Sequence, residues 1–383
     1  MNSKHPALAP ARRTQDIERN VSRRAFDFLH ALVATRETSP EPPPVRATKL
    51  GLIPAWQAWT RALEERDGER LPQFHLSSAP DYGPPSAVQA AMDLFVEAMR
   101  VNGTRWDEGA SVEEAVQKFA LLGSAAALYQ VRPHAVIEPT EALQTWLAHT
   151  DISQDVPAAL LKLPFPAIFI RFGPQMAQAV DATPWASVNR PLTTSGVYVL
   201  ETLTANHREL VFMAVGVTLE HEQEMPHTLQ LIFDDESDSL IDHVINLERK
   251  RAVGSDSSVA MIQMCIKVLL YLQTAGAVRI DDLHRHETIV PLAPANGKKA
   301  SIEQRLAGRR KQVARRYNRI IVGPAQLPAQ VIHHTPGEKA PHWRAGHMRM
   351  QAHGPQHSLR KLIFIAPTLI RADLLGETDQ APH

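Results

Sequence analysis

The stretch GVYVLETLTANHRELVFMAVGVTLE, residues 196–220, decides the fold of the second half of the chain. It contains two runs rich in β-branched and aromatic residues, 196–203 and 209–220, which are separated by a short segment with Asn206 and His207. Runs of this kind favour β-strands, and their short spacing suits antiparallel pairing. The sequence therefore predicts two adjacent strands at this point.

The neighbouring sequence extends this sheet and adds helices to it. AIFIRF (167–172) and TLQLIFD (228–234) have the same strand-like composition, so we expect at least four strands. A helix should follow from the capping-box pair Ser239 and Asp242, and a strongly apolar helix is predicted at 257–275. A sheet with a helical layer is an α+β arrangement.

The predicted fold is α+β, with a helical N-terminal region, a central antiparallel sheet with packed helices, and a basic C-terminal region with two further strands. Capping and periodicity signals place helices at 16–37, 86–100 and 111–129, and the two C-terminal strands at 329–334 and 359–367. The expected regions are a mainly helical one at 1–160, an α+β sheet domain at 161–290, a basic connector or helix at 291–320, and a His- and Arg-rich region at 321–383 packed on the sheet.

Composition excludes several classes of protein. The single cysteine, Cys265, rules out an internal disulfide framework and lies on the apolar stripe of a predicted helix, where we expect it in the core. No apolar segment follows the basic start of the chain, and Lys267 interrupts the longest apolar helix candidate, so we expect a cytoplasmic protein with no membrane partner. The common nucleotide-binding, serine-hydrolase and zinc-protease motifs are missing, so no cofactor is expected.

Charge is unevenly distributed, although the formal net charge is zero. Residues 220–245 contain eight carboxylates and no Lys or Arg, whereas residues 296–371 contain fifteen Lys or Arg and two Glu. Such a basic region suggests a polyanionic partner, and the acidic region suggests a cationic peptide or the basic part of the same chain. The candidate peptide-binding residues are Asp234, Asp235 and Glu236.

The basic residues of 301–320 recur at helical spacings of three and four, which would place several of them on one side of a helix. They could contact RNA phosphates or form an ordinary solvated face, and both alternatives stay open. With the stacking aromatic of the tail, the candidate RNA-binding residues are Arg309, Arg310, Lys311, Arg315, Arg316, Arg319 and Trp343.

The tail PHWRAGHMRMQAHGPQHSLRKLIFIAP (341–367) is rich in His and Arg. His and Arg are suitable groups for metal-independent RNA cleavage, so the candidate catalytic residues are His342, Arg344, His347 and Arg349. The same residues could bind RNA without chemistry, so enzymatic activity stays undecided. The His spacings match no compact zinc pattern, and no metal site is predicted. Gly346 and the pair Gly354–Pro355 suggest turns, so we expect residues 341–358 to be a shaped loop.

The motif His-Trp-Arg-Ala-Gly-His-Met-Arg at 342–349, followed by Gly354–Pro355, the basic pair Arg360–Lys361 and the strand LIFIAPTLI, resembles the C-terminal signature of a group of phage- and plasmid-borne proteins. That group includes the anti-CRISPR family directed at the type V-A effector nuclease. The family tail usually has a second Trp where this chain has Met348, which removes a stacking indole from that position.

The resemblance implies a protein that recognises the N-terminal peptide of a target as it is translated and causes degradation of the target's mRNA. The implied partners are a nascent polypeptide and the ribosome or mRNA. Two alternatives remain: a metal-independent ribonuclease, and a plasmid-encoded nucleic-acid-binding accessory or regulatory protein.

Overall fold

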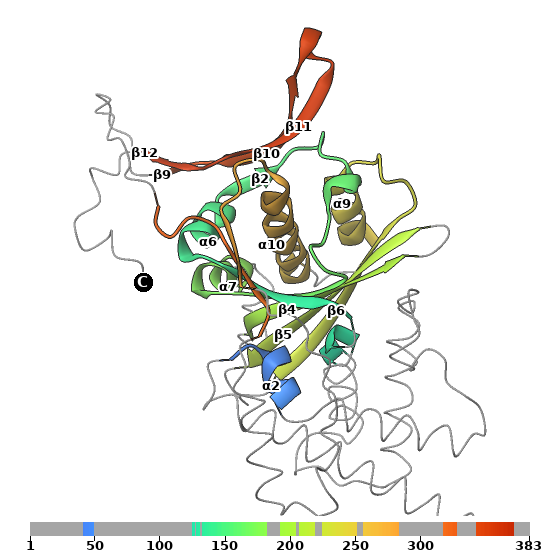
Figure 1. Cartoon of the computed structure of the whole chain (residues 1–383), viewed down its shortest axis with the longest axis vertical. Coiled ribbons are helices and arrows are strands. Elements are labelled where there is room, and N and C mark those ends of the chain that lie inside the picture. Colours follow the sequence, from blue (N-terminus) through green and yellow to red (C-terminus); the bar gives the residue numbers. More distant parts are fainter. Residues whose placement is uncertain are drawn as a thin grey trace, which may run out of the picture.

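The computed structural model describes residues 41–49, 125–126, 128–130, 132–181, 192–203, 207–218, 224–250, 256–282, 317–327 and 342–370. Within this part of the chain the largest element is a mixed seven-stranded sheet with the order β6-β5-β4-β3-β1-β8-β7 (Figure 1). Its strands are β1 (His134–Pro139), β3 (Ala167–Arg171), β4 (Leu192–Leu203), β5 (Arg208–Thr218), β6 (Glu224–Phe233), β7 (Arg279–Asp282) and β8 (Arg319–Val322).

The four strands predicted from composition are confirmed as β3, β4, β5 and β6. Each is antiparallel to the next, and the register of β4 and β5 aligns Val199 with Phe212. The fold is therefore α+β, as predicted. The sheet is mixed, however, because β1 runs parallel to both β3 and β8.

The helices lie mainly on one side of the sheet. Figure 1 shows α6, α7, α9 and α10 on one side of the sheet and α2 on the other. Their bounds are α2 (Pro43–Lys49), α6 (Glu141–Ala148), α7 (Pro174–Asp181), α9 (Leu240–Lys250) and α10 (Asp256–Gln273). The predicted apolar helix is confirmed as α10, and Cys265 on it is fully buried in the main core. Among the described residues, no helix has the length and apolar character needed to cross a membrane.

Both faces of the central strands are buried, as expected for strands with parallel partners. On the α10 side, alternate residues such as Ile168 and Ile170 join the main core. The residue between them, Phe169, points to the opposite face, which we call the second face, and meets Tyr198 edge-on at 4.9 Å between ring centroids. Tyr129, from a helical segment, packs on Tyr198 at 5.7 Å. The second face is thus an aromatic core of its own.

Strand β1 and helix α6 were missed by the sequence analysis, which treated residues up to 160 as mainly helical. β1 occupies the centre of the sheet, with Val136 and Ile137 fully buried. It ends at Pro139, and Thr140 then caps α6 by accepting a hydrogen bond from Leu143 N at 3.2 Å.

Several predicted elements have mixed outcomes. Helix α9 forms as predicted, but the Ser239 hydroxyl is buried and makes no hydrogen bond among the described residues, so it does not complete the capping box. The predicted basic connector or helix at 291–320 was extended too far, because Arg319 already belongs to β8. The predicted helices at 16–37 and 86–100 and the predicted strand at 329–334 lie outside the described residues.

A buried arginine joins the acidic turn after β6, residues 234–236, to the sheet. Arg208, at the start of β5, is 8% exposed. Its guanidinium donates to Glu236 Oε1 at 2.7 Å and to the backbone oxygens of Leu161 (2.8 Å) and Ala158 (3.0 Å). Glu201 lies 3.6 Å away, and the guanidinium also stacks 4.7 Å from the Phe233 ring centroid. The charge is therefore compensated by hydrogen bonds and carboxylates from several segments.

The adjacent residue, Glu209, is a buried acid with an uncompensated oxygen. Its side chain points to the second face, is 1% exposed, and its Oε1 makes no hydrogen bond in the described part of the chain. Burial raises the pKa of Glu209 to about 7. Because this folded-state pKa lies above the ordinary value of 4.5, the folded protein binds the proton more tightly, and stability is lost as the pH rises from about 4.5 to 7.

Glu209→Gln should remove this loss. The free energy of unfolding should rise by about 1–3 kcal/mol at pH 8, and the gain should shrink towards zero near pH 4, where the carboxyl is protonated in both states. Urea denaturation of both proteins across this pH range measures the difference. Parallel pH profiles for the two proteins would contradict the assignment.

Candidate functional site

The His- and Arg-rich tail forms a β-hairpin, not the predicted loop. Its strands are β10 (Gly346–His353) and β11 (Leu359–Ile365), and residues 346–365 are called the C-terminal hairpin from here on. The two short strands β9 (His342–Arg344) and β12 (Thr368–Ile370) flank it and pair with each other. The predicted strand at 359–367 is confirmed as β11. Residues 342–358 are mostly strand because the turn is confined to Gly354–Ser358 at the tip.

The base of the hairpin is anchored on the body of the protein. β10 pairs in parallel with β2 (Thr150–Ile152), and Gly346 N donates to His149 O at 2.8 Å. A Cβ at Gly346 would lie 2.6 Å from Ile365 O and 2.7 Å from Pro367 Cδ, so no larger residue fits without a backbone shift. The glycine of the tail motif therefore marks a close approach of two chain segments, not a turn.

The two faces of the hairpin have different roles. Met348, Met350, Leu362 and Phe364 point towards α10, and Met348 is fully buried. Position 348, where the resembling tails have a Trp, is thus a core position. The opposite face carries His347, Arg349, Gln351 and His353 on β10 and Leu359, Lys361, Ile363 and Ile365 on β11.

The tip of the hairpin projects from the body into solvent (Figure 1). Every residue from Gly354 to Lys361 is exposed. Residues 342–370 contain four Lys or Arg, four His and no Asp or Glu. Within the hairpin Arg349 faces Ile363, Arg360 faces Ala352, and Lys361 faces Gln351, so no carboxylate of the hairpin itself lies across from these cations. The body contributes two acids at the base, because Asp151 of β2 is paired with His347 and Asp155 Oδ2 accepts a hydrogen bond from Met350 N at 3.2 Å. The tip of the hairpin is therefore an exposed, basic arm.

Trp343 is held in place at the junction of the tail and the body. Its ring stacks on His149 with 4.6 Å between centroids and 15° between planes, and it is half-buried. Lys267 of α10 donates to Leu147 O at 3.1 Å, at the C-terminal end of α6, where a cation interacts favourably with the helix dipole. Burial, followed by the charge of Lys267, lowers the pKa of His149, and burial lowers the pKa of Lys267.

The candidate catalytic residues lie on two strands. His342 and Arg344 share one side of β9, opposite Trp343, while His347 and Arg349 share the outward face of β10. All four are exposed, and none lines the pocket described below. In the described part of the chain, no three His, Cys, Asp or Glu side chains come together as a metal site would require.

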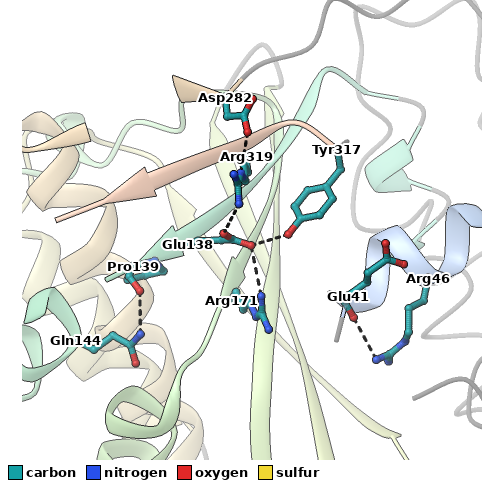
Figure 2. Close-up of polar contacts among 9 residues, drawn as sticks. All are labelled: Glu41, Arg46, Glu138, Pro139, Gln144, Arg171, Asp282, Tyr317 and Arg319. Atoms are coloured by element: carbon teal, nitrogen blue, oxygen red, sulfur yellow. Dashed lines mark hydrogen bonds and ion pairs between the residues drawn. The ribbon is translucent and has the colours of Figure 1, made fainter. Parts of the chain in front are cut away.

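Arg319 is the one candidate RNA-binding residue of the basic segment that the structure describes, and it contributes to an ion-pair network on the second face (Figure 2). Its Nε donates to Asp282 Oδ2 at 2.9 Å, and its Nη1 lies 3.8 Å from Glu138 Oε2. Glu138 also accepts from Tyr317 Oη at 2.7 Å and lies 3.5 Å from Arg171 Nη1. Burial, then this hydrogen bond, raises the pKa of Tyr317.

Arg319 and the hairpin lie on opposite sides of the sheet. Arg319 is on the second face, and the hairpin packs on the α10 side. The other candidates of this segment lie outside the described residues: Arg309, Arg310, Lys311, Arg315 and Arg316.

The candidate peptide-binding acids form a tight turn after β6. Asp235 accepts hydrogen bonds from Ser237 N (2.8 Å) and Oγ (2.7 Å), which lower the pKa of the carboxyl. Glu236 binds Arg208, and Asp234 is exposed. Two of the three carboxylates therefore have partners within the chain.

A pocket of about 370 Å³ lies at the base of the hairpin, and the sequence analysis missed it. Three aromatic rings line it: the ring centroid of Phe364 lies 5.7 Å from that of Trp146 and 5.3 Å from that of Tyr271. Its lining comes from α6, the end of α10, the segment after β8, and β11: Trp146, Tyr271, Thr274, Ala275, Gly276, Val278, Pro324, Lys361, Leu362, Ile363, Phe364 and Ala366. In the sequence, the feature that could have indicated this pocket is the apolar run 362–366, which follows the basic pair Arg360–Lys361.

Comparison of the chain with known protein families identifies the family to which it belongs. The chain matches the AcrVA2-like family, described as the anti-CRISPR type V subtype A2 family, over residues 137–372. The match covers more than half of the 383 residues and includes the sheet apart from the first three residues of β1, together with α10, the pocket and the hairpin. No curated protein and no solved structure matches the chain. The chain belongs to the AcrVA2-like anti-CRISPR family.

Proposed function

We propose that this protein, encoded by a phage or plasmid, lowers the amount of a target protein by recognising the target's N-terminal peptide during translation and causing loss of its mRNA. The proposal places it in the cytoplasm, with a nascent polypeptide and the ribosome or mRNA as partners. Family membership supports the anti-CRISPR part of this proposal. The route through the nascent peptide comes from the likeness of the tail motif at 342–349.

The observation that most favours this function is the C-terminal hairpin. An exposed arm with Arg349, Arg360 and Lys361 and no carboxylate within 342–370 has the charge needed to contact RNA phosphates. The arm is fixed at its base by buried Met348 and Leu362, so its basic residues are presented on a rigid element. A protein that acts on a ribosome during translation needs such a surface, because ribosomal RNA and mRNA are both polyanions.

A translation-dependent reporter tests the proposal. Candidate N-terminal peptides from type V-A nucleases are fused to a reporter, and its mRNA is measured with and without this protein. The mRNA should fall only when the peptide is translated. A synonymously recoded version, which keeps the peptide and changes the RNA, should respond equally, whereas a frameshifted version should not. Loss of mRNA that follows the nucleotide sequence and not the peptide would overturn the proposal.

A cleavage assay with purified protein distinguishes this function from that of a ribonuclease. Purified protein is mixed with labelled RNA in the absence of ribosomes, alongside His342→Ala and His347→Ala. We expect no cleavage above background in any sample, because these two side chains are exposed and lie outside the pocket. Cleavage that both substitutions abolish would replace the proposed function with a metal-independent ribonuclease.

A further inference from the structure

Strand β11 has one free edge. In the small sheet β11-β10-β2, it pairs with β10 along its whole length, from Leu359 opposite His353 to Ile365 opposite His347. Within the described part of the chain no strand pairs with its other side. A sheet edge presents backbone N–H and C=O groups that an extended segment can pair with.

The pocket lies against this free edge. Residues 361–364 form one wall, and Tyr271 at the end of α10 and Gly276 after it form another. The Tyr271 hydroxyl accepts a hydrogen bond from Val278 N at 3.2 Å, which fixes the ring and uses its polar group. What remains is an apolar space of about 370 Å³, large enough for one aromatic or branched aliphatic side chain.

The two faces of β11 determine what an added strand would present. Leu362 and Phe364 point to the pocket side, whereas Lys361 and Ile363 point to the outer face. A partner strand would therefore alternate, with apolar side chains next to Leu362 and Phe364 and other side chains next to Lys361. Since residues 342–370 contain no carboxylate, an acidic side chain on the partner would complement the charge on the outer face.

We infer that the free edge of β11 binds an extended peptide as an added strand, with one bulky apolar side chain in the pocket and a carboxylate beside Lys361. This inference rests on the proposed function, since it gives the recognised peptide a site and a chemical pattern. The site differs from the acidic turn at 234–236, two of whose carboxylates are already bonded.

Binding is measured with a fluorescein-labelled octapeptide of alternating Val and Glu in which one central Val is Phe. One control peptide has Pro at two Val positions, which removes backbone donors, and another has Lys in place of every Glu. The first peptide should bind by fluorescence anisotropy, and both controls should bind at least about tenfold more weakly. Amide hydrogen exchange should show protection of residues 360–366 by the first peptide alone.

Gly276→Phe blocks the pocket without straining the fold, because nothing lies within 4 Å of a Cβ built at this glycine. This variant should weaken binding by at least about tenfold. Gln178→Phe is the matched control: it places the same ring on an exposed position of α7, outside the pocket and the hairpin, and should leave the affinity unchanged. Equal affinity of Gly276→Phe and the unmodified protein would overturn the inference, as would a failure of the first peptide to bind.

The reporter separates this inference from the proposed function. If translated peptides still cause loss of mRNA in the presence of Gly276→Phe, the function stands and the β11 site is wrong. If the octapeptide binds at β11 and no translated peptide affects mRNA, the site stands and the proposed function is wrong.

Discussion

Reversing three charges on the C-terminal hairpin, Arg349→Glu, Arg360→Glu and Lys361→Glu, should abolish the effect of the protein on reporter mRNA and weaken RNA binding by on the order of 100-fold. The three side chains are exposed and face Ile363, Ala352 and Gln351 across the strands, so their reversal breaks no cross-strand ion pair. The fold should therefore survive while the attraction to phosphates is lost.

The salt dependence of binding gives this prediction a second measurement. If three phosphates are neutralised by these residues, the slope of log affinity against log salt concentration should fall by about 2 for single-stranded RNA. Filter binding of a labelled oligonucleotide at several salt concentrations measures both affinity and slope. The control compares two single charge reversals, Arg360→Glu on the hairpin and Lys162→Glu at an exposed position of the body. Lys162→Glu should change the affinity and the slope much less than Arg360→Glu does. Unchanged affinity of the triple variant would show that the hairpin is not the RNA contact.

Arg208→Met should be among the most destabilising single substitutions in the sheet, with a loss of about 3–5 kcal/mol in the free energy of unfolding. The guanidinium is buried and bonds Glu236 and two backbone oxygens, those of Ala158 and Leu161. Methionine fills a similar volume and has no donors, so it leaves buried acceptors without partners. Glu201 would also lose the nearby charge that opposes the burial-driven rise of its pKa.

A second arginine–glutamate pair on the same sheet is the control for this prediction. Arg171 lies 3.5 Å from Glu138, but its side chain is 44% exposed. Solvent screens such a pair, so Arg171→Met should cost less than about 1 kcal/mol. Urea denaturation followed by circular dichroism compares the two variants. Equal losses for the two would mean that burial does not determine the contribution of Arg208.

The elements that could be predicted are those with a pattern in their own sequence, such as β-branched composition or a long apolar run. Strands β4, β5 and β6 follow one another with short connections, and β3 has the same composition although α7 lies between it and β4, so β-branched composition was sufficient to predict these strands and their antiparallel pairing. Helix α10 was predicted because residues 259–272 are apolar except for Gln263 and Lys267, and a run of this length exceeds that of a strand. In contrast, β1 is a six-residue strand next to helices, and no local pattern predicts its parallel pairing with β8.

The site was predicted less completely than the fold. The tail was identified as basic, but Gly346 was interpreted as a turn residue, whereas it lies in β10 where two segments come too close for a side chain. The alternation of buried Met348 with exposed His347 and Arg349 is visible in the sequence only once a strand is assumed. The pocket could not be predicted, because Trp146, Tyr271 and Phe364 meet only in the folded chain.

The position of β8 has a consequence for how this protein is made. Val136 of β1 pairs with Arg319, 183 residues further along the chain, so the centre of the sheet is completed only when most of the polypeptide has been synthesised. Contacts of such long sequence separation slow folding, whereas the β4–β6 meander can form early from neighbouring segments. Until β8 arrives, one edge of β1 is left without its native neighbour, and unpaired edges promote aggregation. Chains that terminate before residue 317 should therefore accumulate as aggregates, and the rate of synthesis of the last third should influence the yield of native protein.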